Sequence, residues 1–229
     1  QLKHLKELSK ELNTLNISLK LIEAEGIKDE SKRIIEFVKT HKISEVFINK
    51  DYGFNETQRD LDLEEELSRL KIRLNIYDSS IFDPNSIKTQ SNTFFKVFTP
   101  YSRAFRSKLI TSKIQSVGLP KKQKIKILEN DEIQNIELDE KRSNILEAYI
   151  AGEENALTKL EEFIDHKILN YKENRDFPAI EGTSSLSPYL SSGILSSRQC
   201  LLKVFDKFSE SEIGVKTWVT EIIWREFYK

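Results

Sequence analysis

Two short segments of the sequence carry side chains that could do chemistry, and the first is rich in hydroxyls. Four hydroxyl groups fall within five positions directly before Pro188: Thr183, Ser184, Ser185 and Ser187. Hydroxyls and backbone N–H groups at the start of a helix can bind a phosphate or a pyrophosphate. A turn that only caps a helix has the same composition, and composition alone favours that simpler interpretation.

The second segment, residues 218–228, combines four different polar or aromatic groups at helical spacing. Steps of three or four residues place them on one side of a helix: Glu221, Trp224, Arg225 and Tyr228. A carboxylate, an indole, a guanidinium and a phenol together suit stacking on nucleic-acid bases and hydrogen bonding to them. An aromatic core stripe flanked by an ion pair would show the same pattern.

The usual catalytic signatures are missing from the sequence. The seven glycines form no phosphate-binding loop, and no nucleophile elbow or metal-binding histidine pair occurs. The three histidines and one cysteine are too scattered for a structural zinc site. If the protein is an enzyme, we therefore expect a cofactor to carry the difficult step. The single Cys200 fits a reducing compartment, and we expect the cytoplasm.

The N-terminal part of the sequence alternates between helical and strand patterns. Helices are predicted over 2–15, from a cap at Ser31, and from a cap at Asn55. Strands are predicted over 17–21, 46–48 and 74–76, where β-branched or leucine residues cluster or alternate. Helices alternating with strands indicate an α/β fold with a parallel sheet.

Charge and periodicity change after this part. Residues 96–126 contain nine lysines and arginines and no acid, which suits either a phosphate backbone or a solvated face. Residues 127–162 are mainly acidic, and 114–140 show no clear period. From about residue 143 the pattern is only helical. A helix is predicted to end near Tyr171, and others to begin at caps Ser187, Ser196 and Ser211.

We accordingly predict three parts: a partial α/β domain over 1–105, a connector over 106–142, and the first part of an all-helical domain over 143–229. The sequence contains no methionine, opens within a helical pattern and closes without a stop signal. We therefore expect it to be an internal piece of a longer protein.

Several longer motifs, in order along the chain, resemble the photolyase/cryptochrome flavoprotein family. In the helical part they are Arg175-Asp176-Phe177-Pro178, Glu181-Gly182-Thr183-Ser184, Leu186-Ser187-Pro188-Tyr189-Leu190, Gly193-Ile194-Leu195-Ser196, Arg198-Gln199-Cys200, Trp218, and Glu221-Ile222-Ile223-Trp224-Arg225-Glu226-Phe227-Tyr228. Earlier segments are similar to the antenna domain of bacterial cyclobutane pyrimidine dimer photolyases: Asn49, Tyr52, Asn55-Glu56, Arg59-Asp60 and Lys96-Val97-Phe98-Thr99-Pro100-Tyr101.

The resemblance implies a Rossmann-like antenna-binding domain followed by a helical FAD-binding domain. It implies a carbon–carbon lyase, in which light drives an electron from reduced FAD into a pyrimidine dimer of damaged DNA. The target nucleotide would be flipped out of the duplex. The protein is then expected to be a monomer without a membrane segment, and the piece of sequence alone is expected to be inactive.

The same resemblance implies roles for individual residues. Glu221 and Trp224 would contact the flipped dimer, by hydrogen bonding and by stacking. FAD would be held by Tyr171, Thr183, Ser184, Ser185, Leu186, Ser187 and Trp218. DNA would be contacted by Arg175, and we count Arg225 and Tyr228 with it. Asn55 and Glu56 would contact a 5,10-methenyltetrahydrofolate antenna. At Ser185 the family usually has arginine, which is a departure from the motif.

Two other functions remain open at this point. One is a cryptochrome, a blue-light receptor with the same fold and no repair activity. The other is a scaffold that binds no flavin. Glu221 and Trp224 favour repair, because a lesion pocket needs both a stacking indole and a hydrogen-bonding carboxylate.

Overall fold

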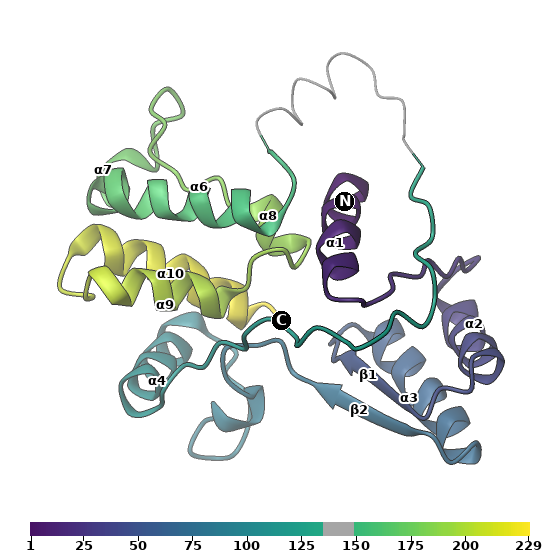
Figure 1. Cartoon of the computed structure of the whole chain (residues 1–229). Helices are drawn as coiled ribbons and strands as arrows, with labels where there is room; N and C mark the ends of the chain where they lie inside the picture. The colour runs from purple at the N-terminus through teal and green to yellow at the C-terminus, as the bar shows by residue number, and fades with distance from the viewer. Residues whose placement is uncertain (135–148) are drawn as a thin grey trace. The chain divides into compact units, whose positions relative to one another are not determined.

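The computed structural model describes residues 1–134 and 149–229, which form two compact units (Figure 1). One unit comprises residues 20–79 and contains both strands. The other comprises residues 1–19 and 80–228 and is helical in its described part. No helix in the described ranges combines the length and the apolar composition that crossing a bilayer requires.

The α/β unit is built on a two-stranded parallel sheet. It contains α2 (Ile27–Thr40), β1 (Glu45–Asn49), α3 (Phe54–Arg69) and β2 (Arg73–Tyr77). Parallel strands need a crossover, and α3 supplies it between β1 and β2. The predicted parallel sheet is therefore confirmed, with Val46 opposite Leu74 and Ile48 opposite Ile76. Its core lies between the helices and the sheet and contains Ile35, Val38, Leu63 and Leu67.

The strand predicted over 17–21 is wrong. This segment follows α1 (Leu2–Thr14) and pairs with no strand of residues 1–134 and 149–229. Leu19 accepts a backbone hydrogen bond from Asp131 at 3.1 Å, and its own N–H donates to the Asn130 side chain at 3.0 Å. Alternating apolar residues indicate an extended, half-buried chain, and an irregular partner satisfies that pattern as well as a strand does.

Two of the predicted helix caps are also wrong. Ser31 lies inside α2, where its buried hydroxyl donates to the backbone carbonyl of Arg59 in α3 at 3.0 Å. Asn55 lies inside α3, whose cap is Gly53. Both helices begin earlier than the serine and asparagine suggest, because a glycine can occupy the cap position without a capping side chain.

The described part of the helical unit contains, in chain order after α1, a series of short and medium helices. They are η1 (Pro84–Ser86), α4 (Phe98–Thr111), α6 (Glu153–His166), η2 (Ile168–Asn170), α7 (Tyr171–Asn174), α8 (Ser187–Ser191), α9 (Ser197–Lys207) and α10 (Ile213–Phe227). Residues 149–229 contain no strand, as predicted. The helix predicted to end near Tyr171 ends at His166, and η2 and α7 follow it.

Helix α10 lies at the centre of the helical unit and contacts α4, α7, α9 and η2 (Figure 1). Its buried residues include Val215, Trp218, Val219, Ile222 and Ile223. The predicted cap at Ser196 is confirmed by a capping box, in which Ser196 and Gln199 each bond the other's backbone N–H. The caps of α8 and α10 are Leu186 and Glu212, one residue away from the predicted serines.

The connector predicted over 106–142 is only partly described. Its first residues, 106–111, belong to α4, whereas 113–134 contain no helix or strand. Residues 135–142 lie outside the described residues, as does the predicted start of the helical domain at 143. The division into three parts stays a prediction.

Candidate functional site

The first cluster of predicted site residues joins α7 to α10. The Nη1 of Arg175, which follows α7, donates to Oε1 of Glu221 in α10 at 2.5 Å. The guanidinium of Arg175 also lies 5.3 Å from the centre of the Tyr171 ring. The hydrogen bond to Glu221 raises the pKa of Arg175 above its ordinary value. Within the described residues Oε2 of Glu221 accepts no hydrogen bond, and 38% of the Glu221 side chain is exposed.

The hydroxyl-rich segment forms one wall of a pocket of ≈ 470 Å³. Thr183, Ser184 and Ser185 line this pocket together with Lys159 and Lys167. Hydroxyls and ammonium groups are suitable partners for a phosphate. Two acids, Glu162 and Glu181, also line the pocket, and Glu181 lies 3.7 Å from the ammonium of Lys167.

The indole of Trp218 connects this pocket to α10. Its Nε1 donates to Oγ of Ser184 at 3.4 Å, and its ring packs against Phe163 with centroids 5.5 Å apart. Tyr171 meets the same Phe163 ring edge-on, with centroids 5.7 Å apart. Burial raises the pKa of the Tyr171 hydroxyl, so the phenol stays protonated. Leu186 is buried in the core, and Ser187 is exposed at the start of α8.

The second cluster surrounds Trp224, one turn after Glu221 on α10. The Trp224 indole stacks on Phe98 of α4, with centroids 3.5 Å apart and planes 7° from parallel. Tyr228 also stacks on the indole, at 5.3 Å and 17°. An aromatic stack that ends at an exposed tyrosine is a surface on which a nucleic-acid base could also stack.

The other predicted DNA contact on this helix, Arg225, has a different partner. Its Nη2 donates to the backbone carbonyl of Leu190 in α8 at 2.8 Å. Here Arg225 ties α10 to α8, and its role in DNA binding stays a prediction.

The predicted antenna residues lie in the α/β unit. Asn55 and Glu56 occupy the first turn of α3, where Asn55 is exposed and Glu56 is half-buried. The Glu56 carboxylate turns back over Gly53, since a Cβ placed there would lie only 2.0 Å from Oε2. A carboxylate at the start of a helix is stabilised by the helix dipole whether or not a ligand is present.

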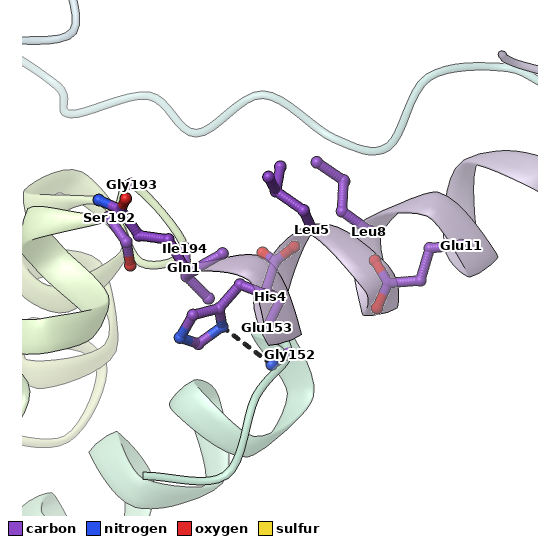
Figure 2. Close-up of a pocket in the computed structure, with 10 residues that line it drawn as sticks. All are labelled: Gln1, His4, Leu5, Leu8, Glu11, Gly152, Glu153, Ser192, Gly193 and Ile194. Carbon is purple, nitrogen blue, oxygen red and sulfur yellow. Dashed lines mark hydrogen bonds between the residues drawn. The ribbon is translucent and has the colours of Figure 1, made fainter. Parts of the chain in front are cut away.

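A smaller pocket of ≈ 320 Å³ contains none of the predicted site residues (Figure 2). Leu5 and Leu8 of α1 line it together with Gly193 and Ile194 of the loop before α9. Figure 2 shows the backbone N–H of Gly152 donating to Nδ1 of His4, at 3.2 Å. Burial lowers the pKa of His4, which fits a neutral ring that accepts this bond.

The structure adds three residues that the sequence analysis did not assign to the site. Phe98 stacks on Trp224, and Lys159 and Lys167 line the pocket beside the hydroxyls. Phe98 lies within a segment already recognised as motif-like, 96–101. The two lysines could not be recognised as site residues from the sequence, because they lie at ordinary solvent-facing positions of the helical pattern.

Comparison with known proteins gives consistent matches. The family model described as DNA photolyase matches residues 1–121. The deoxyribodipyrimidine photo-lyase of Vibrio cholerae is 33% identical over 236 residues, which cover 99% of this chain and 49% of that relative. The enzyme of the same name from Escherichia coli is 33% identical over 192 residues, covering 82% and 40% of the two chains. The chain thus spans about half the length of the curated relatives it matches.

Solved structures show the same fold. A bacterial class III photolyase from Agrobacterium tumefaciens matches with a TM-score of 0.80 and 23% identity, over 99% of this chain and 47% of that one. A cryptochrome from Synechocystis matches with a TM-score of 0.73 and 21% identity, over 99% and 48%. The fold is therefore that of photolyases and cryptochromes. Since the family model also matches more than half of its residues, the chain belongs to the DNA photolyase family.

Proposed function

We propose that the full-length protein repairs cyclobutane pyrimidine dimers in DNA by light-driven electron transfer, and that this chain contributes the dimer-contacting face of α10. The observation that carries the proposal is the placement of Glu221 and Trp224 one turn apart, with a carboxylate oxygen and an aromatic stack both at the surface. The curated relatives are named deoxyribodipyrimidine photo-lyase, which supports this activity.

Glu221 and Trp224 would make different contacts with the flipped dimer. Trp224 would stack its indole on the flipped dimer, a contact that requires no readout of the DNA sequence. Glu221 would hydrogen bond a pyrimidine through Oε2, while Arg175 holds Oε1 and fixes the carboxylate's orientation. A fixed group aimed at charge that develops during a reaction stabilises the reactive state more than the bound ground state.

The pocket beside the hydroxyl segment fits part of a flavin dinucleotide. Thr183, Ser184 and Ser185 supply hydroxyls, and Lys159 and Lys167 supply positive charge for a pyrophosphate. These two lysines would replace the positive charge of the arginine that the family usually has at the position of Ser185. When bound in the reduced state, FAD supplies the light-excited electron, which explains why the chain needs no acid–base set.

Four finer assignments belong to the same proposal. The α/β unit would be part of a Rossmann-like domain, as its parallel β1–α3–β2 crossover suggests. Asn55 and Glu56 would contact a methenyltetrahydrofolate antenna, supported by family resemblance. The protein would act as a cytoplasmic monomer on damaged DNA. A cryptochrome-type receptor has the same fold, and the pairing of Glu221 with Trp224 favours repair over it.

Two substitutions in the full-length, flavin-loaded protein test the proposed roles. Glu221→Ala is expected to keep FAD and to lower the repair yield per absorbed photon. Trp224→Ala is expected to weaken binding of a dimer-containing oligonucleotide by about 1–3 kcal/mol, the value of one base stack. Flavin absorbance, dimer affinity and repair yield are measured for each variant.

Glu212→Ala is a matched control, because it removes the same charge from an exposed position at the start of α10. The control is expected to resemble the unmodified protein in all three measurements. If Glu221→Ala loses flavin while repair per bound flavin stays normal, Glu221 is structural and the proposed lesion site on α10 is wrong.

A further inference from the structure

Both faces of the Trp224 indole are covered in this structure. Phe98 and Tyr228 are each nearly parallel to the indole, with centroids 3.5 and 5.3 Å from it. At these distances two rings on the same face would overlap each other, so they lie on opposite faces. A base that stacks on Trp224 must therefore replace one of them.

The two covering rings differ in how firmly they are held. Phe98 is half-buried at the start of α4, packs against the core, and meets Phe227 edge-on with centroids 5.8 Å apart. Helix α4 is itself anchored by Phe105, which is 1% exposed. Tyr228 follows the last turn of α10 and is 76% exposed. Replacing Tyr228 disturbs one exposed side chain, whereas replacing Phe98 would disturb the packing of α4 on α10.

We propose that Phe98 is a positioning residue for Trp224: it holds one face of the indole, and a flipped base takes the opposite face in place of Tyr228. This inference rests on the proposed function and deepens it. It gives Tyr228 the role of an exchangeable cover instead of a direct DNA contact. An indole whose orientation is already fixed loses less freedom when the base stacks on it, so binding is stronger.

The test measures equilibrium binding of the full-length, flavin-loaded protein in the dark. Its probes are an oligonucleotide with one thymine dimer and the same oligonucleotide undamaged. Phe98→Leu is expected to weaken dimer binding about 3- to 10-fold, the value of an aromatic pair, and to leave binding of undamaged DNA unchanged. Phe98→Tyr keeps the ring and is expected to restore dimer binding to within about twofold.

Three further variants separate positioning from general damage. Phe95→Leu is the matched control, because Phe95 lies in the same segment but contacts Tyr101, with centroids 6.1 Å apart. It is expected to bind the dimer normally. Tyr228→Ala is expected to bind the dimer about 2- to 5-fold more tightly, because no ring has to be displaced. Phe98→Leu combined with Trp224→Ala is expected to bind no more weakly than Trp224→Ala alone. Thermal unfolding checks that every variant is folded.

The outcomes distinguish this inference from the proposed function. If Trp224→Ala binds the dimer as tightly as the unmodified protein, the lesion site is wrong and the inference falls with it. A second outcome is that Trp224→Ala weakens dimer binding, but Phe98→Leu weakens it by the same factor whether or not Trp224 is present. The proposed function then stands, and positioning of Trp224 by Phe98 is overturned. Weaker dimer binding by Tyr228→Ala would overturn the assignment of the exchangeable face.

Discussion

The ion pair between Arg175 and Glu221 contributes little to stability. Both side chains are about one-third exposed, at 30% and 38%, and pairs of this kind typically contribute about 0–1 kcal/mol. We therefore explain this short contact by its effect on the orientation of the Glu221 carboxylate, and not by its contribution to the free energy of unfolding. This is why the Glu221 carboxylate, held at Oε1 and accessible at Oε2, is the centre of the proposed site.

Cys200 gives a direct test of the packing beneath this site. The thiol is fully buried in α9, and burial raises its pKa to about 12, although nearby Arg225 opposes the shift. Because the thiolate is the reactive form, we expect no labelling of Cys200 by an aromatic disulfide reagent at pH 8 in the native protein. In denaturant the same residue should be labelled fully.

Mass spectrometry of the Cys200 peptide measures the labelling. Equal labelling rates with and without denaturant would show that α9 does not cover the thiol as described.

Single residues also show how far the sequence could predict the site. The spacing on α10 placed Glu221 and Trp224 together, and the structure agrees because that spacing is a property of one helix. Their partners are far away in the sequence: Arg175 lies 46 positions before Glu221, and Phe98 lies 126 positions before Trp224. Periodicity within a helix carries no information about contacts at such separations, so the Phe98 stack could not be found from the sequence.

Among the helices, α10 depends on a close approach at its first turn. A Cβ on Gly214 would lie 2.2 Å from the carbonyl oxygen of Ile168 and 2.3 Å from that of Leu169. Alanine favours a helix by about 1 kcal/mol over glycine, but this contact would force α10 away from η2. We expect Gly214→Ala to lower the free energy of unfolding by about 1–3 kcal/mol, the usual effect of overpacking.

Gly118→Ala is the control, because no atom lies within 4 Å of a Cβ at that position. Denaturant unfolding compares the two variants. Equal midpoints for Gly214→Ala and Gly118→Ala would mean that α10 and η2 are not in the described contact.

At the level of elements, the helices and the parallel sheet followed from local pattern, but one strand did not. Residues 46–48 and 74–76 form β1 and β2 because the two segments pair with each other. Apolar residues of α2 and α3 pack against both strands. Residues 17–21 show an equally good alternation, but Leu19 accepts its backbone hydrogen bond from Asp131, which lies in a segment without secondary structure. A strand requires a partner, and the sequence pattern of one segment does not specify one.

For the whole molecule, the basic run over 96–126 has two different parts. Arg106 is bound inside the helical unit, to Glu210 at 2.7 Å and Thr220 at 3.0 Å. The lysines at 121, 122 and 124 are exposed. Composition alone could not separate structural from solvated charges, because Glu210 and Thr220 lie more than 100 positions after Arg106, just before α10 and within it. Only the exposed part is suited to contact a phosphate backbone.

The central claim is tested most directly by dimer repair under light. The full-length, flavin-loaded protein is mixed with an oligonucleotide carrying one thymine dimer, and intact thymines are quantified by chromatography after blue-light exposure and in the dark. The account predicts repair in the light, none in the dark, and a lower yield per photon for Glu221→Ala than for Glu212→Ala. A flavin-loaded protein that binds the dimer and leaves it unrepaired in the light would contradict the account.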